Sequence, residues 1–183
     1  MKKLVLVFCL MILVSLALCG QQKAAPCKDE AKVKALLDKV LEMWNKPDYA
    51  LISQLYAPDA TAWSSSMPEP FVGHEGIRKW IENTRTMMPD MVMAFPEVVV
   101  QGDKIATIWT MTGTQTGPMA MPNGTLPPTG RKVSIKGLAI DYLKDGKFVK
   151  EIVAFNMLEM LMQLGFQLMP PQPPPPPAPP APK

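Results

Sequence analysis

The sequence contains little histidine, little cysteine and little net charge. Its 183 residues include one histidine and three cysteines, so we expect neither a zinc site nor a framework of several disulfides. The 19 Lys and Arg residues nearly balance the 16 Asp and Glu residues. Without a basic surface we expect no nucleic-acid partner, and we expect no metal or other cofactor. The length allows one domain of ordinary size that is stable without such supports.

The first 18 residues have the pattern of a signal peptide. Two lysines precede an uncharged, mostly apolar run, Leu4 to Leu18, which suits a signal sequence better than a bilayer-spanning helix. The next residue, Cys19, resembles the lipidated cysteine of a bacterial lipobox, and residues 19–28 would then form a flexible tether. Simple secretion after cleavage is the alternative. We therefore expect export to the cell envelope, in the periplasm or on the outer surface, with a lipid on Cys19 as the membrane anchor.

Residues 29–169 have the pattern of one domain in which helices precede a sheet. Apolar spacing predicts helices over residues 29–47, 48–56, 74–88 and 157–164, and strands over residues 59–63, 96–101, 104–114, 132–143 and 148–155. The short polar segments 102–103 and 144–147 are typical of hairpin turns. We therefore expect an α+β domain with helices packed on one face of an antiparallel meander.

Residues 170–183 form a proline-rich tail, PPQPPPPPAPPAPK. Proline fixes such a segment as polyproline II, which at about 3.1 Å per residue reaches roughly 40 Å. The composition favours a stiff spacer, and a ligand for an aromatic groove is the alternative.

Several short motifs occur in order between residues 34 and 166. They are YAPDA at 56–60, PFVG at 70–73, MPD at 88–90, GTQTG at 113–117, PPTGR at 127–131 and QLG at 163–165. Their order and spacing resemble the SnoaL-like polyketide cyclase and ester cyclase branch of the nuclear transport factor 2-like superfamily. The resemblance implies a cone, in which a helix hairpin and a further helix pack on a curved antiparallel sheet and enclose a pocket. It also implies a homodimer that pairs through the sheet.

The resemblance further implies where proton-transfer residues would lie. In characterised cyclases of this family, a histidine in a GTHTG-like motif and an aspartate on the next strand line the cavity, and the aspartate acts as general acid and base in an aldol closure. In this sequence Gln115 occupies the histidine position and Ala139 the aspartate position. Asp141, two residues on, projects to the same side of a regular strand as Ala139. The alternative, which we favour at this point, is that Asp141 is a solvated residue at the outer end of the strand.

Other pocket positions follow from the predicted strands. Trp63, Trp109 and Met111 are candidate ligand-binding residues on strands that could line the cavity, and such a lining suits a small apolar or aromatic molecule. Asn156 is a further candidate at the cavity mouth, although with Glu159 it also forms a pattern typical of a helix cap.

Two functions stay open. The first is an enzyme, a cyclase, isomerase or hydrolase, that acts on a small carbonyl compound, with Asp141 as the proton-transfer group and Gln115 hydrogen-bonded to the developing oxyanion. The second is a non-catalytic ligand-binding lipoprotein of the envelope. The family's histidine and aspartate are both replaced, which favours the second.

Overall fold

The computed structural model describes residues 30–121 and 124–169. The predicted signal peptide, Cys19, the tether and the proline-rich tail lie outside these residues. The elements run in the order α2 (Glu30–Asn45), α3 (Ala50–Leu55), β1 (Tyr56–Ser64), β2 (Phe71–Val72), α4 (Gly73–Met87), β3 (Val92–Gln101), β4 (Lys104–Thr114), β5 (Met119–Met121), β6 (Gly124–Leu126), β7 (Lys132–Lys144), β8 (Lys147–Phe155) and α5 (Met157–Gln163). No helix within this described part is long and apolar enough to cross a membrane.

Six strands form one curved sheet in the order β2-β1-β8-β7-β4-β3. Strands β3, β4, β7 and β8 form the predicted antiparallel meander, in which β4 and β7 pair without a break from Lys104–Tyr142 to Thr114–Lys132. The pairing of β1 with β8 is parallel, so the sheet is mixed where we expected a wholly antiparallel one. These two strands are far apart in the sequence, and no hairpin turn sets their relative direction.

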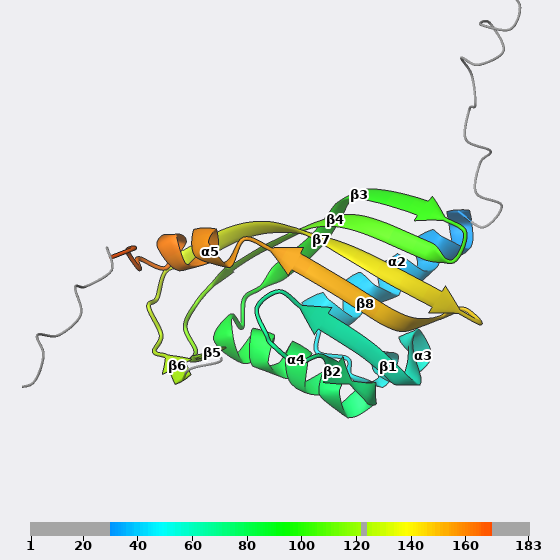
Figure 1. Cartoon of the computed structure of the whole chain (residues 1–183), viewed down its shortest axis with the longest axis horizontal. Coiled ribbons are helices and arrows are strands. Elements are labelled where there is room, and N and C mark those ends of the chain that lie inside the picture. Colours follow the sequence, from blue (N-terminus) through cyan, green and yellow to red (C-terminus); the bar gives the residue numbers. More distant parts are fainter. Residues whose placement is uncertain (1–29, 122–123, 170–183) are drawn as a thin grey trace, which may run out of the picture.

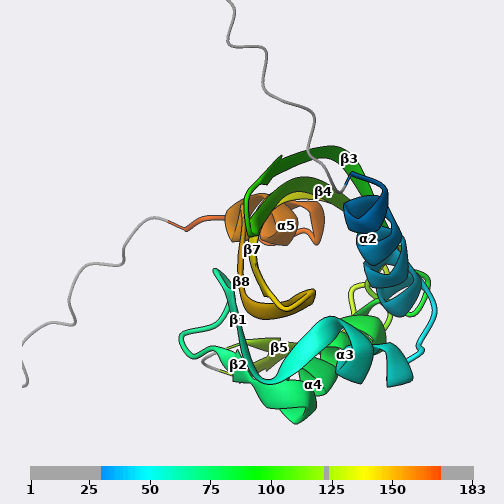
Figure 2. The same cartoon turned by 90° about the vertical axis from the view of Figure 1, so that its right-hand side faces the viewer.

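The sheet curls around an interior that the helices close from the other side. Figure 2 shows this along the axis of the cone, with β3, β4, β7, β8 and β1 following one arc and α2, α3 and α4 completing the ring. In Figure 1 the same strands run obliquely in front of α2. The prediction of an α+β cone is therefore confirmed.

Alternation along the two central strands decides which side chains face the interior. On β7 the buried positions are Val133, Ile135, Gly137, Ala139 and Asp141, and the residues between them are exposed. The facing positions on β4 from Ile105 to Gly113 alternate in the same way. No bulge interrupts this pair, so Asp141 shares the inner face with Ala139 as regular strand geometry predicts.

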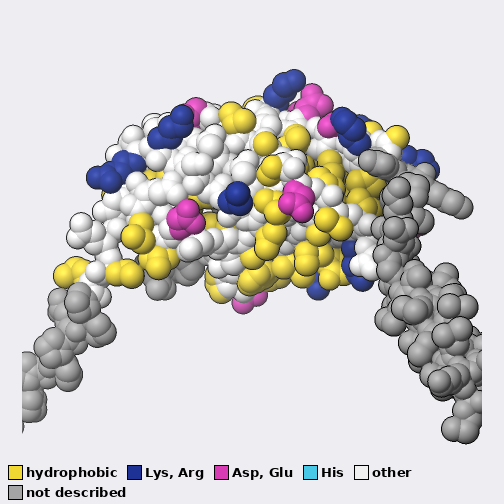
Figure 3. All heavy atoms as spheres, turned by 90° about the horizontal axis from the view of Figure 1, so that it is seen from above, with side chains coloured by type: hydrophobic (Ala, Val, Ile, Leu, Met, Phe, Trp, Pro, Cys, Tyr) yellow, Lys and Arg dark blue, Asp and Glu magenta, His cyan; other side chains and the backbone are white. Residues whose placement is uncertain are grey.

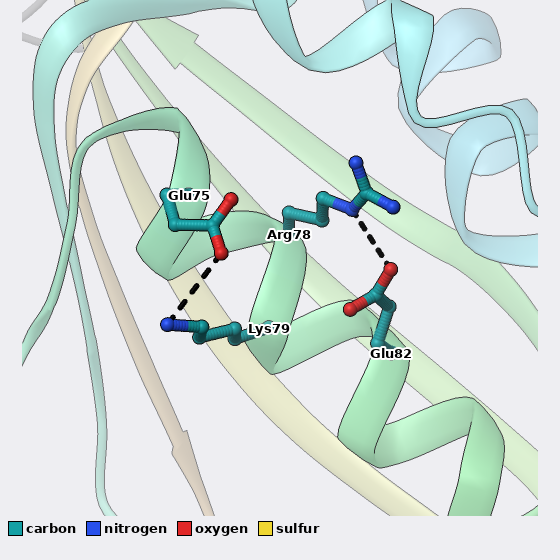
Figure 4. A network of polar contacts seen from close by, with 4 residues as sticks. All are labelled: Glu75, Arg78, Lys79 and Glu82. Carbon is teal, nitrogen blue, oxygen red and sulfur yellow. Dashed lines mark hydrogen bonds and ion pairs between the residues drawn. The ribbon is translucent and has the colours of Figure 1, made fainter.

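The inner and outer faces of α4 differ in character. Ile77 and Ile81 are fully buried against the sheet, whereas the outer face carries the ion pairs Glu75–Lys79 and Arg78–Glu82, at 3.5 and 2.8 Å (Figure 4). Both pairs are exposed, and exposed pairs add little to stability. The buried face therefore fixes the position of the helix.

The outer face of the sheet exposes apolar side chains (Figure 3). One row crosses five neighbouring strands in register and consists of Val99, Ala106, Ile140, Ile152 and Trp63. Leu138, beside this row on β7, is 59% exposed. A contiguous apolar face of this kind is typical of a surface that meets a partner.

Candidate active site

The interior of the cone contains a cavity of about 150 Å³ between the concave face of the sheet and the helices α2 and α4. Most of its lining is aromatic or methionine, with Trp44, Tyr56, Phe71, Trp80, Phe95, Trp109, Phe148, Phe155, Met67, Met87, Met93, Met111, Met119, Met157 and Met160. The described lining contains two acidic residues, Asp141 and Glu151, and no lysine, arginine or histidine. The cavity is therefore an apolar chamber with its ionisable groups concentrated at one place.

Asp141 and Glu151 lie directly opposite each other on β7 and β8. Their residues are 7% and 8% exposed, and side chains paired in this way have Cβ atoms about 4.5–5.5 Å apart. On its other side Glu151 is paired with Ala62 of β1, which is too small to separate it from the cavity. The fold thus brings two carboxyl groups together on the inner face.

Tyr56 completes this group. Its hydroxyl donates a hydrogen bond to Oε2 of Glu151 at 2.7 Å, and its ring packs on Phe148 with the ring centres 5.2 Å apart. The residue is buried at the start of β1. The contact requires β1 to lie beside β8, since the two residues are 95 positions apart in the sequence.

Burial determines how these groups ionise. The pKa of Asp141 is well above its ordinary value because the carboxyl is desolvated and because Glu151 adds a negative charge nearby. Desolvation likewise raises the pKa of Glu151 to about 7, although the hydrogen bond from Tyr56 lowers it. The hydrogen bond from Tyr56 favours the ionised form of Glu151, and no such donor to Asp141 occurs among the described residues. The two carboxyl groups therefore titrate as a coupled pair in different environments.

Burial and the two carboxyl groups also raise the pKa of Tyr56 well above its ordinary value, so its hydroxyl stays protonated. Two further polar atoms in the cavity, Thr107 Oγ1 and Trp109 Nε1, are buried and have no hydrogen-bond partner among the described residues. No cluster of three His, Cys, Asp or Glu side chains that could hold a metal ion occurs in residues 30–121 and 124–169.

The structure places three of the sequence-predicted residues in the cavity. Trp109 and Met111 line it from β4, and Asp141 lines it from β7. The favoured reading of Asp141 as a solvated residue is therefore wrong. The strand continues to Lys144 beyond it, and the packed rings of Tyr56 and Phe148 line the same cavity.

Two other predicted residues lie elsewhere. Trp63 is 39% exposed on the outer face of β1, because its neighbours Ala62 and Ser64 take the inward positions. Asn156 is exposed, and its Oδ1 accepts a hydrogen bond from the backbone N–H of Glu159 at 3.1 Å. The helix-cap interpretation of Asn156 is thus confirmed, and neither residue belongs to the described cavity lining.

Gln115 is fully buried but holds a loop rather than lining the cavity. Its Nε2 donates to the carbonyls of Gly117 and Pro127 at 2.8 and 3.1 Å, and its Oε1 accepts from the backbone N–H and the hydroxyl of Thr129 at 2.8 and 2.6 Å. Both amide hydrogens are therefore hydrogen-bonded to backbone carbonyls of the loop. The expectation that Gln115 binds an oxyanion is therefore wrong.

Sequence reasoning missed Glu151 and Tyr56. In a regular hairpin counted from the Lys144–Lys147 pair, Asp141 would face Lys150. A register shift between Tyr142 and Leu143 inserts one extra residue in β8 and brings Glu151 opposite Asp141 instead. The only sequence signal was an acidic residue within the apolar strand 148–155.

Comparison with known proteins places this geometry in a family. The model of the SnoaL-like polyketide cyclase family matches residues 34–164. Among solved structures, TsrD from Streptomyces laurentii is 27% identical with a TM-score of 0.66, and the match covers 75% of this chain and 97% of that one. IdmH from Streptomyces antibioticus is 26% identical with a TM-score of 0.61, over 73% and 98% of the two chains.

A third structure, AclR from Streptomyces galilaeus, is 27% identical with a TM-score of 0.61, over 74% of this chain and 96% of that one. No curated protein matches the sequence. The family match spans the helices, the sheet and the carboxyl pair, which are the elements that form and line the cavity. The chain belongs to the SnoaL-like polyketide cyclase family.

Proposed function

We propose that this protein is an enzyme that transfers a proton at a carbon atom next to a carbonyl group, with Glu151 as the base and Asp141 as the acid. The observation that carries the proposal is the buried Asp141–Glu151 pair, with Tyr56 bonded to Glu151. Environments that give two neighbouring carboxyl groups different proton affinities are typical of acid–base sites.

The chemistry needs no group beyond these side chains. The Glu151 carboxylate takes a proton from the carbon, the C–H electron pair becomes the enolate, and protonated Asp141 supplies a proton to the oxygen that gains charge. In an isomerisation, Glu151 returns its proton to a different carbon and the enol proton goes back to Asp141. In an aldol cyclisation, Asp141 keeps its proton while the enolate carbon attacks a second carbonyl of the same molecule. The resulting alkoxide takes the proton of Asp141, and the proton that Glu151 removed from the carbon then passes to Asp141.

The lining indicates the kind of substrate. Its many aromatic and methionine side chains favour an apolar or aromatic molecule, and methionine adapts to irregular shapes. A carboxylate or phosphate would find no positive side chain in the described lining and would be repelled by the carboxyl pair. A small, neutral carbonyl compound is therefore the substrate class that we propose.

The test is exchange of the carbon-bound protons of simple ketones. We would incubate 1-tetralone and acetophenone with the purified protein in deuterated water and follow deuterium incorporation by NMR. Exchange faster than in buffer is expected, with a rate that rises through about pH 7 as Glu151 ionises. The other ionisable groups of the described lining are Asp141 and Tyr56, and burial raises the pKa of both.

Glu151→Gln should reduce the exchange to the buffer rate, whereas Glu97→Gln, at an exposed position on β3, should leave it unchanged. Tight binding of both ketones without exchange would instead establish the alternative, a ligand-binding protein without catalysis.

A further inference from the structure

We infer that Thr107 and Trp109 form an oxygen-binding subsite, which holds the carbonyl oxygen of the substrate by two hydrogen bonds. The consequence of this subsite for catalysis rests on the proposed function. The subsite itself rests on two atoms that take no part in the carboxyl pair. Thr107 Oγ1 and Trp109 Nε1 are both buried, both line the cavity and both lack a hydrogen-bond partner among the described residues. Buried polar atoms are rarely left without a partner, so these two need an explanation.

The two atoms come from one strand and face the same way. Thr107 and Trp109 are separated by one residue on β4, and both lie on its buried face, where they are 2% and 5% exposed. Side chains at positions i and i+2 of a strand project side by side. An indole N–H can only donate, and a threonine hydroxyl can donate as well. Together they match the two lone pairs of a single carbonyl oxygen.

Packing holds the indole in place. A Cβ atom at Gly137 would lie 2.2 Å from Cζ2 and 2.5 Å from Cε2 of Trp109, so only glycine lets the ring rest on β7 at this point. The ring of Phe155 meets it edge-on, with the ring centres 5.8 Å apart. The N–H group is therefore fixed by its surroundings before any ligand arrives, as a binding group should be.

The subsite lies beside the carboxyl pair. In the β4–β7 ladder, Thr107 is paired with Ala139 and the next inner position on β7 is Asp141. Diagonal neighbours of this kind are about 7–8 Å apart. The residue on β7 opposite Thr107 is Ala139, whose side chain is a single methyl group, so a ligand can lie over it beside the indole ring that covers Gly137. An oxygen bound by Thr107 and Trp109 would then lie on the side of Asp141, which can give a proton to the third lone pair that the oxygen gains as an enolate. The neighbouring carbon would face Glu151.

This arrangement predicts selection for an oxygen atom and not merely for an apolar shape. The probes are 1-tetralone, which has a carbonyl group, and tetralin, which has the same rings without it. Binding of both would be measured by calorimetry with the wild type, Thr107→Val and Trp109→Phe. Each variant should bind 1-tetralone about threefold to tenfold more weakly and tetralin as the wild type does. Thr107→Ser, which keeps the hydroxyl, should restore 1-tetralone binding.

The deuterium-exchange assay tests the subsite in a second way. Hydrogen bonds to an oxygen that gains charge matter more than those to a neutral carbonyl, so Thr107→Val and Trp109→Phe should each slow deuterium exchange about 100-fold. If the wild type exchanges no proton but the variants still lose their preference for 1-tetralone, the subsite stands and the proposed function fails. If the variants exchange protons as fast as the wild type, the proposed function stands and the subsite fails.

Equal losses of affinity for 1-tetralone and for tetralin would also overturn the subsite, because they would indicate a packing effect. The same holds if the wild type shows no preference for 1-tetralone. If Trp109→Phe does not fold, the nearly isosteric Thr107→Val and its control Thr107→Ser decide the matter alone.

Discussion

Glu151 should make the folded protein less stable as the pH rises, and Glu151→Gln should remove that effect. Burial raises the pKa of Glu151 in the folded protein to about 7, from an ordinary value of 4.5. The folded chain therefore binds this proton more tightly than the unfolded chain. The contribution to the free energy of unfolding is fully present below about pH 4.5 and is lost as the pH rises through about 7.

The size of this loss of stability follows from the two pKa values of Glu151, in the unfolded and in the folded chain. The difference between 4.5 and about 7, at about 1.4 kcal/mol per pH unit, corresponds to about 3 kcal/mol of stability lost between pH 4.5 and pH 8.5. In Glu151→Gln the side chain cannot ionise, and its amide oxygen can still accept the hydrogen bond from Tyr56. Without the charge of Glu151, the pKa of Asp141 also falls towards its ordinary value, which flattens the profile of the variant further.

The assay is urea unfolding of the wild type, Glu151→Gln and the control Glu97→Gln between pH 4.5 and pH 8.5. The wild type and the control should lose about 3 kcal/mol more than Glu151→Gln over this range. Parallel profiles for all three proteins would mean that Glu151 titrates as an exposed carboxyl does, and would refute the buried pair on which the proposed acid–base chemistry depends.

Three further perturbations test the neighbouring features. Tyr56→Phe removes the hydrogen bond that lowers the pKa of Glu151, so the midpoint of the pH–rate profile should move to higher pH; an unchanged midpoint would contradict this contact. Gln115→Ala should destabilise the protein by about 2–4 kcal/mol and speed amide hydrogen exchange in the loop that follows, whereas the exposed Gln101→Ala should do neither. If the homodimer that the family resemblance implies forms through the outer face of the sheet, Leu138→Lys should sediment as a monomer; a wild type that is itself monomeric would contradict the expected homodimer.

The sequence by itself determined the helices, the longer strands and the face of β7 that Asp141 occupies, but not the short strands β2, β5 and β6. Helical spacing located α2 and α4, and the strands of the meander begin and end within a few residues of their predicted bounds, apart from β3, which starts four residues earlier. Periodicity also put Asp141 on the face of Ala139, because the side-chain period of an uninterrupted strand is two. The order of the motifs was enough to indicate the family.

Only the tertiary structure decided the composition of the site. One extra residue in β8 turns Lys150 away and brings Glu151 opposite Asp141, and a bulge of this kind leaves no trace in hydrophobic periodicity. Tyr56 reaches Glu151 because β1 joins the sheet beside β8, a contact that no local pattern encodes. Likewise Trp63 points outward and Gln115 holds a loop, because strand pairing and loop packing set their directions. Asp141 and Glu151 can both be recognised as acidic residues in the sequence, but their pairing depends on a register shift within the β7–β8 hairpin, and the contact with Tyr56 depends on a distant segment.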